Sequence, residues 1–180
     1  MINSYNESNV KKLTKYIKSN KKYRDIQSLV FIGIGTDKIL FDSVGPLVGS
    51  LINHYGLNIN YYGDMDNPIH ALNMVEALEF IQMKHPNSVV IAVDSSISPE
   101  GGTYGLGRVS VRKGSLLPGL GLGKELPEVG DISIRACIFE GEMDEVEDLY
   151  STSIQFVYRL AEDVVNLIHH TVENLSRNIG

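Results

Sequence analysis

The stretch "VFIGIGTDKILFDSVGPLVG", residues 30–49, joins two patterns. It begins as an unbroken apolar run of strand length, which is typical of a strand buried on both faces of a parallel sheet. It then passes into an apolar helix that continues to Gly56, where a glycine predicts the helix end. The turn between the two carries Asp37, Asp42 and a Gly-Pro pair. A buried strand that leads at once into a helix is the repeating unit of an α/β fold.

The rest of the chain repeats this unit. We expect strands at residues 28–34, 57–63, 88–94, 106–114 and 131–139, and helices at residues 4–20, 41–56, 67–85 and 145–174. Asn67 as a cap and Pro68 in the first turn mark the start of the third helix. Two glycine-rich segments, residues 95–105 and 114–130, follow strands and are long for a compact domain. The alternation predicts an α/β protein: a three-layer α/β/α sandwich of the phosphorylase/hydrolase-like kind, with a mostly parallel sheet of five or slightly more strands.

Bulk composition narrows the class further. The 180 residues are enough for one domain with a sizeable core. The single cysteine, Cys137, excludes an intrachain disulfide and, in an apolar run, is expected to be a small buried side chain. No apolar run approaches the roughly 18–20 residues that span a bilayer, and the N-terminus lacks the apolar core of a secretion signal. We therefore expect a cytoplasmic protein.

The charges are unevenly distributed. The formal net charge is −6, but residues 1–24 sum to +6 and the remaining residues to −12. We expect a basic helical leader at residues 1–24, followed by a single α/β domain at residues 25–180. A solvated helix face that packs on the acidic body explains the leader, and contact with nucleic acid or an anionic surface is the alternative. Because no aromatic-interleaved basic patch and no nucleic-acid motif is present, we expect neither nucleic acid nor a membrane as a partner.

Two aspartates fall where α/β sheets place their sites, beyond the carboxyl ends of the strands. Asp42 lies in the turn after the first strand, and Asp94 ends the third strand. If these strands are neighbours, the two carboxylates share one crevice, where burial and repulsion raise one pKa while the other group stays ionised. Such a pair can activate water for attack on a carbonyl, or bind a metal. Simpler alternatives are a helix cap for Asp42 and a turn residue for Asp94.

Other chemistries lack their motifs. "GIGTDK" departs from G-x-G-x-x-G because position 38 is Lys, and Lys124 lacks the Ser or Thr that follows the lysine of a phosphate-binding loop. The G-x-S-x-G motif of serine hydrolases is also absent. A metal site would have to borrow His70 from the segment "DMDNPIH", which turn formation explains equally well. We expect no metal and no cofactor, and keep metal-dependent hydrolysis through Asp42, Asp94 and His70 as a weaker alternative.

Four segments together resemble a known family: "GIGTDKILFDSVGPLVG", "YGDMDNPIHALN", "VIAVD" and "PGLGLGKELPEVGDISI" look like the YyaC-like sporulation proteins of spore-forming Firmicutes. The resemblance runs from about residue 29 to about residue 138, with a compatible C-terminal helix, and leaves residues 1–24 outside. That family is similar in turn to the germination protease, which degrades small acid-soluble spore proteins. It also shares a fold with the hydrogenase-maturation endopeptidases.

The resemblance implies roles for the two acids. The proposed catalytic aspartates of the germination protease, in motifs that read like "DALGP" and "IDA", fall on Asp42 and Asp94. The acids that bind nickel in the hydrogenase-maturation enzymes fall on the same positions, but their histidine falls in the "PGLGLG" loop, where this chain has none. The resemblance thus implies a sporulation-associated endopeptidase, in the sporulating cell or spore interior, in which an aspartic-type acid pair activates water.

The alternative is a non-catalytic sporulation factor that binds a peptide or partner in the same crevice. After Asp94 the relatives read roughly "ACLGR" or "ALAAR", whereas this chain reads "SSISPEGGTYG", without an arginine at the matching position. Lys124 stands where the protease loop has Asn. Either function takes a protein or peptide as its ligand.

Further residues are expected to support the acids. Glycines let a substrate backbone approach closely, so the glycine-rich loops are candidates for substrate binding. The supporting set comprises Thr36, Asp37, Asp66, His70, Gly119, Gly121 and Lys124. The C-terminal helix has more apolar positions than one sheet face requires, and Tyr150, Phe156 and Tyr158 are candidates for a homodimer contact.

Overall fold

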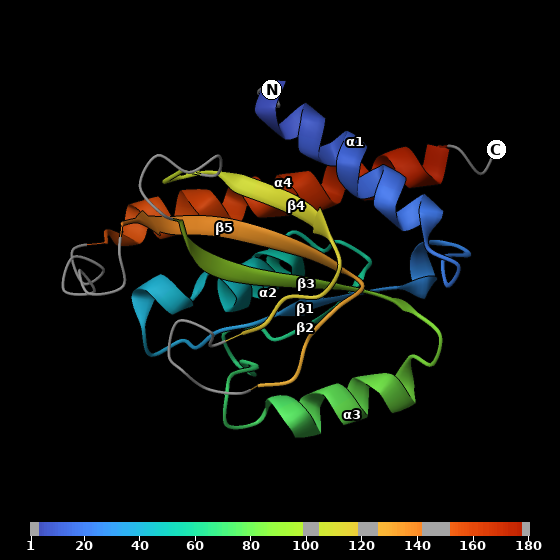
Figure 1. Ribbon diagram of the computed structural model, residues 1–180, viewed down its shortest axis with the longest axis horizontal. Helices are drawn as coiled ribbons and strands as arrows, with labels where there is room; N and C mark the ends of the chain where they lie inside the picture. Colours follow the sequence, from blue (N-terminus) through green and yellow to red (C-terminus); the bar gives the residue numbers. More distant parts are fainter. Residues whose placement is uncertain (1–3, 99–104, 119–125, 142–151, 178–180) are drawn as a thin grey trace.

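Five strands form one sheet in the order β2-β1-β3-β5-β4 (Figure 1). The computed structural model describes residues 4–98, 105–118, 126–141 and 152–177. Its elements, in chain order, are α1 (Ser4–Ser19), η1 (Ile26–Ser28), β1 (Leu29–Gly33), η2 (Leu40–Asp42), α2 (Val44–His54), β2 (Asn60–Tyr62), α3 (Met74–Lys84), β3 (Val89–Ser98), β4 (Val109–Lys113), β5 (Ile132–Glu140) and α4 (Ile154–Arg177). None of the helices in these ranges combines the length and apolarity that a membrane crossing requires.

The sheet is parallel except at one edge. Strand β1 pairs in parallel with β2 and β3, and β3 pairs in parallel with β5, whereas β4 runs antiparallel to β5. All five residues of β1 are buried, as the continuous apolar run predicts for a strand covered on both faces. The predicted α/β class and the mostly parallel five-stranded sheet are confirmed.

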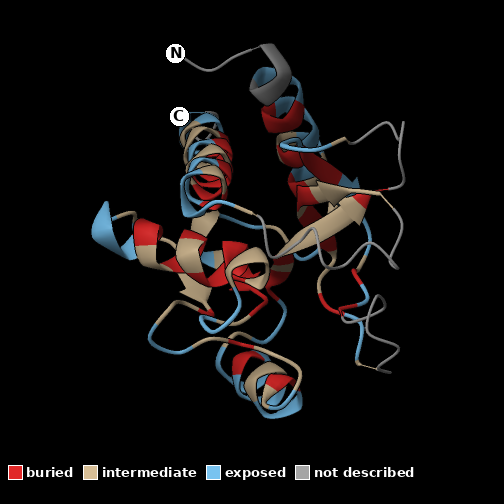
Figure 2. Cartoon of the chain, turned by 90° about the vertical axis from the view of Figure 1, so that its left-hand side faces the viewer, coloured by how far each residue is buried: buried red, intermediate tan, exposed pale blue. Residues whose placement is uncertain are grey.

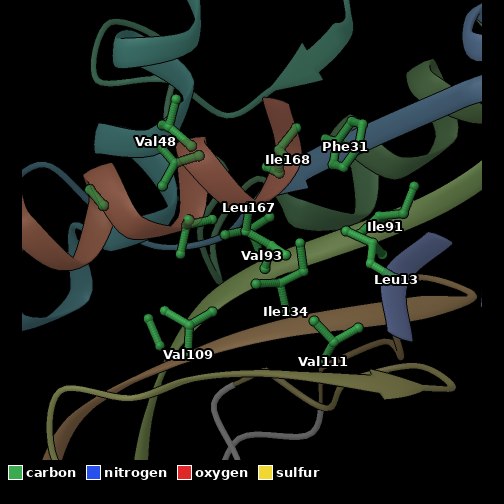
Figure 3. Close-up of a cluster of buried hydrophobic side chains, with 14 of the residues drawn as sticks. Leu13, Phe31, Val48, Ile91, Val93, Val109, Val111, Ile134, Leu167 and Ile168 are labelled. Atoms are coloured by element: carbon green, nitrogen blue, oxygen red, sulfur yellow. The ribbon is translucent and has the colours of Figure 1, made fainter. Parts of the chain in front are cut away.

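Helices cover both faces of the sheet. On one face, a large apolar cluster joins side chains of α1, α2 and α4 to the sheet, and Figure 3 shows Phe31, Ile91 and Ile134 among its members. On the other face, Met74 and Ile81 of α3 belong to a smaller cluster built on β1 and β3. Helix α3 lies apart from the other helices in Figure 1, and Figure 2 shows buried residues where the helices face the sheet. The arrangement is a three-layer sandwich.

The basic N-terminal helix contributes to this core. Val10, Leu13 and Ile17 of α1 recur every three or four residues and are all buried in the large cluster. The side-chain amide of Asn9 donates a hydrogen bond of 2.8 Å to the carbonyl oxygen of Val109, at the edge strand β4. The lysines of α1 lie on its exposed side. The apolar stripe of α1 therefore shares one core with the α/β sheet.

The bounds of α3 and β3 differ from those expected. Helix α3 begins at Met74, not at residue 67, because short polar side chains close turns ahead of it. Asp64 Oδ1 accepts hydrogen bonds from the backbone of Asp66 and Asn67, and the Asn73 side chain bonds to the backbone of His70 and Pro68. Strand β3 does not end at Asp94 but continues to Ser98, since β5 pairs with it that far.

The other helices differ at their ends. Helix α2 begins at Val44, after the 3-10 turn η2, rather than at residue 41. Helix α4 is described from Ile154, and the first part of the helix expected at residues 145–174 lies outside the described residues. Tyr150 lies there too. Of the other residues expected at a homodimer contact, Phe156 packs on the large cluster, whereas Tyr158 is exposed.

Shortening Leu13 tests whether α1 belongs to the cooperative core. Leu13 is fully buried, so Leu13→Ala should lower the free energy of unfolding by about 2–5 kcal/mol. Lys12→Ala, on the exposed side of the same helix, is the matched control and should change it by less than about 0.5 kcal/mol. Urea denaturation followed by circular dichroism measures both. Equal effects of the two substitutions would show that α1 is not part of the unfolding unit.

Candidate functional site

The turn after β1 places Asp42. Past the strand, the Ile34 amide donates to the Val93 carbonyl, which carries the β1–β3 pairing one residue further. The Thr36 amide then donates to the Asp42 carbonyl, at 3.0 Å, and closes the turn. Gly35 sits inside this turn with φ of +138°, and a Cβ at this position would overlap the Asp42 carbonyl oxygen. Only glycine fits there, so the turn conformation and the position of Asp42 depend on one another.

Asp42 is not the cap of helix α2. The N-cap position is Ser43, whose hydroxyl donates 2.7 Å back to the Leu40 carbonyl, and no side chain caps the helix from there. Asp42 instead ends the 3-10 turn η2, where it is partly buried. Its pKa is raised from 3.8 to about 6, mainly because burial disfavours the charged form, while the nearby Thr36 amide acts in the opposite direction. The capping alternative is therefore wrong.

Asp94 lies in the centre of the sheet, on β3 between β1 and β5. Its pKa is raised well above the ordinary value, first by burial and second by the negative charge of Asp42. The Ser95 amide and the positive charge of Arg135 oppose this shift. Asp42 follows β1 and Asp94 lies on the neighbouring parallel strand β3, so the two acids are close enough for the charge of Asp42 to raise the pKa of Asp94.

Tyr61 lies on β2, the strand on the other side of β1 from Asp94, and holds the start of α2 in place. Its hydroxyl donates 2.9 Å to the Gly45 carbonyl at the start of α2. Burial, then the charges of Asp64 and Asp94, raise its pKa well above 10, so the hydroxyl stays protonated as a donor. Gly45 packs against the Ile34 backbone, where a Cβ would lie 2.6 Å from the nitrogen. Helix α2 thus approaches β1 closely enough to bring Asp42 to the end of the strand.

Arg135 is a site residue that the sequence analysis missed. It lies directly opposite Asp94 in the β3–β5 pairing. Burial and the positive charge of Arg112 lower its pKa, while Asp94 opposes this effect. The signal that could have identified it is a single charged residue in the otherwise apolar run "ISIRACIF" of β5. In a strand buried on both faces, a charged side chain usually has a partner or a function.

The remaining predicted residues divide into three groups. Thr36 and Asp37 lie in the turn before Asp42, where Asp37 is exposed. Asp66 and His70 take part in the turns ahead of α3, and His70 Nδ1 accepts a hydrogen bond of 3.3 Å from the Leu72 amide. Gly119, Gly121 and Lys124 lie outside the described residues.

The metal alternative finds no geometric support. Within the described ranges, His, Cys, Asp and Glu side chains form no group of three or more that could hold a metal ion. Asp42, Asp94 and His70 all belong to those ranges, so His70 does not join the acids. The local hydrogen bonds of His70 explain its position instead.

Two surface hollows lie at the opposite end of the sheet. One, of about 370 Å³, is lined by residues that precede β1 and β2 and by His169 and Glu173 of α4. The other, of about 260 Å³, is lined by residues that include Lys22, Gln82 and Asp131, at the start of β3 and β5. Neither includes Asp42 or Asp94, so the acids are identified by their charges and their strand positions rather than by either hollow.

Comparison with known proteins gives a family without an assigned activity. Residues 1–167 match the family described as "Protein of unknown function (DUF1256)". A relative from Bacillus subtilis (strain 168), described as "Uncharacterized protein YyaC", is 36% identical over 134 residues. That alignment covers 74% of this chain and 64% of the relative, less than two thirds of its length. The family match includes residues 1–24, which the sequence resemblance left outside.

Replacing Gly45 should destabilise the fold. A methyl group at this position meets the backbone of Ile34, which has no room to move, so Gly45→Ala should lower the free energy of unfolding by about 3 kcal/mol. Gly56→Ala is the control, because a Cβ there meets nothing and only its φ of +64° disfavours alanine, by about 1 kcal/mol. Thermal unfolding of both variants measures the difference. A Gly45→Ala protein as stable as Gly56→Ala would contradict the close approach.

Asp42 should make stability depend on pH. Its pKa is about 3.8 unfolded and about 6 folded, so the folded state binds the extra proton between these values and loses stability as the pH rises from about 4 to about 6. Asp42→Asn removes this loss. It should be more stable than wild type by roughly 2 kcal/mol at pH 7, and equal to it near pH 4. Urea unfolding at pH 4 and at pH 7 measures the gap.

The matched control is Asp37→Asn, in the exposed part of the same turn. It should follow wild type within about 0.5 kcal/mol at both pH values. If Asp42→Asn shows no advantage at pH 7, the carboxylate of Asp42 is not buried as described.

Proposed function

The chain belongs to the DUF1256 family, and from that premise we propose that it is a sporulation-associated endopeptidase in which Asp42 and Asp94 activate water. The observation that carries the proposal is the position of the two acids, Asp42 in the turn after β1 and Asp94 on the neighbouring parallel strand β3, where burial raises the pKa of both. Its sequence resemblance to the germination protease points to the same two residues. The proposed location is the cytoplasm of the sporulating cell or the spore interior.

The pair has the protonation that peptide hydrolysis needs. Burial and then the negative charge of Asp42 raise the pKa of Asp94, so Asp94 keeps a proton where Asp42 is ionised. With Asp42 ionised and Asp94 protonated, Asp42 takes a proton from water while the oxygen of that water attacks the scissile carbonyl carbon. Asp94 gives its proton to the carbonyl oxygen. When the tetrahedral intermediate collapses, the C–N bond breaks and the proton held by Asp42 passes to the leaving amine. Asp94 takes back its proton from the hydroxyl that becomes the new carbonyl, so both acids return to their starting states.

A non-catalytic peptide-binding factor is the second candidate. It is favoured by the polar atoms beside Asp94, where Arg135 Nε and Ser133 Oγ are buried without a hydrogen-bond partner among the described residues. Such atoms suit a bound partner whether or not it is cleaved. We also propose a homodimer contact that uses the exposed Tyr158 of α4, a helix on the side of the molecule away from α3 (Figure 1).

Removing either acid tests the proposal. Wild type and the Asp42→Asn and Asp94→Asn variants are incubated with spore-protein and generic peptide mixtures, and the products are read by mass spectrometry. Loss of the general base or acid should lower the cleavage rate at least about 100-fold in each variant. Glu76→Gln, exposed on α3, is the control and should cleave as wild type does. Circular dichroism checks that every variant is folded.

The outcomes separate the two candidates. The wild-type rate should fall below about pH 6, where Asp42 takes up its proton and no base remains. Cleavage that survives in either Asn variant contradicts the acid-pair mechanism. A folded wild type that binds peptides without cleaving them favours the binding factor.

A further inference from the structure

The sheet carries a polar strip next to the acids. In the strand pairings, Asp94 of β3 lies opposite Arg135 of β5, which lies opposite Ser110 of β4. Two residue pairs further along, Ser133 of β5 lies opposite Arg112 of β4. The polar strip is defined here by Arg135, Arg112, Ser110 and Ser133. The polar strip runs from β5 to β4, and it begins at the strand that lies next to Asp94.

These side chains share the face of the sheet that carries α3. Ile134 and Ala136, which flank Arg135, are buried in the large cluster beneath α1, α2 and α4. Because side chains alternate along a strand, Arg135 and Ser133 project to the opposite face. The apolar cluster on that face draws on α3, β1 and β3 and on the segments between β4 and β5, where Leu116 and Val129 lie. Within the described ranges it includes no residue of β4 or β5 themselves. The polar strip therefore lies beside this apolar cluster rather than beneath it.

Two atoms of the strip have unmet hydrogen-bonding capacity. Arg135 Nε, a donor, and Ser133 Oγ, a donor and acceptor, are both buried and have no hydrogen-bond partner in the described part of the chain. Buried polar atoms nearly always have a partner, and those that do not call for a specific explanation. A bound ligand with oxygen atoms would give both atoms a hydrogen-bond partner.

The charge of the strip selects an anion. Arg112 and Arg135 are close enough for the positive charge of Arg112 to disfavour that of Arg135. The negative charge of Asp94 favours the charged form of Arg135, but burial and Arg112 outweigh it, so the pKa of Arg135 is lowered. An arginine side chain presents parallel N–H groups that fit the two oxygens of a carboxylate. A carboxylate held by both arginines would relieve their repulsion.

We propose that Arg135, together with Arg112, Ser110 and Ser133, forms a carboxylate-binding subsite for the peptide that the acids act on. The inference rests on the proposed function for the identity of the ligand as a peptide. Neighbouring strands lie about 4.8 Å apart, so a group held by Arg135 is one strand away from Asp94. The carboxylate is that of an acidic side chain close to the scissile bond, or the free C-terminus of the peptide.

Binding measurements with matched peptides test the subsite. The probes are fluorescein-labelled nonapeptide pools in pairs: one central Glu against Gln with an amidated C-terminus, and a free C-terminus against an amide with no acidic residue. The protein is the full chain with Asp42→Asn, so that the probes are not consumed. We expect the Glu pool or the free-carboxyl pool to bind at least tenfold more tightly than its neutral counterpart, measured by fluorescence anisotropy. The pair that shows the preference identifies the source of the carboxylate.

Substitutions in the same background locate the effect. Arg135→Gln should reduce the preference to less than twofold, whereas Arg135→Lys, which keeps the charge but loses the paired donors, should retain part of it. Arg112→Gln, at an exposed position, should weaken the preference in a variant with little risk to folding. Arg159→Gln is the control, because this exposed arginine lies on α4, at the other face of the sheet.

The outcomes distinguish this inference from the proposed function. A carboxylate preference that depends on Arg135 supports the subsite even if wild type cleaves no peptide, in which case the endopeptidase proposal fails alone. Equal binding of charged and neutral pools, no binding of any pool, or a preference that survives both Arg135→Gln and Arg112→Gln overturns the subsite, even where cleavage by wild type is established.

Discussion

Helix α2 packs against β1 without the spacing that side chains usually impose. Gly45 rests on the Ile34 backbone, and the Tyr61 hydroxyl bonds to the Gly45 carbonyl across the same contact. This approach fixes the length and path of the turn from Gly35 to Asp42. It also decides where Asp42 lies relative to Asp94, since β1 and β3 pair directly up to this turn. The electrostatic coupling of the acids is thus a consequence of backbone packing rather than of any contact that the acids make themselves.

The same packing buries two carboxyl groups and thereby lowers the free energy of unfolding at neutral pH. Both carboxyl groups have raised pKa values because burial disfavours their charged forms, so at neutral pH they oppose folding. Asparagine would keep the shape without that penalty, and the aspartates are therefore poorly explained as structural residues. The large cluster of α1, α2 and α4 supplies the compensating stability, and the apolar stripe of α1 is part of it. The packing of the N-terminal helix α1 thus contributes to the stability that offsets the burial of the two acids.

Sequence pattern predicted the layers better than the boundaries. The buried strands β1 and β3 are visible as continuous apolar runs. The rule that α/β sites lie beyond strand ends points to Asp42 and Asp94 as candidates, although β3 continues past Asp94 to Ser98. The start of α3 was missed because the side chains of Asp64 and Asn73 compete with the helix for backbone hydrogen bonds, which local propensity does not reveal. The extension of β3 was missed because its polar residues are held in the sheet by pairing with β5, a contact distant in sequence. Arg135 depends on the same pairing, since only the register shows that it faces Asp94.

The order of the strands explains why polar residues gather on β5 and β4. Helix α3 packs over β1 and β3, and within the described ranges these are the strands of the central sheet, together with β2, that contribute residues to the apolar cluster on its face. Asp94 follows the last β3 residue of that cluster along the strand. Beyond it, a sheet selected for stability alone would carry apolar residues at Ser133 and Arg135, because replacing buried polar groups by well-packed apolar ones is often neutral or stabilising. Here the chain keeps a guanidinium group and a hydroxyl whose buried atoms have no partner within the described residues. Since incompletely satisfied polar groups lower stability, the position of Arg135 opposite Asp94 supports the proposed carboxylate ligand, which would give these atoms a partner.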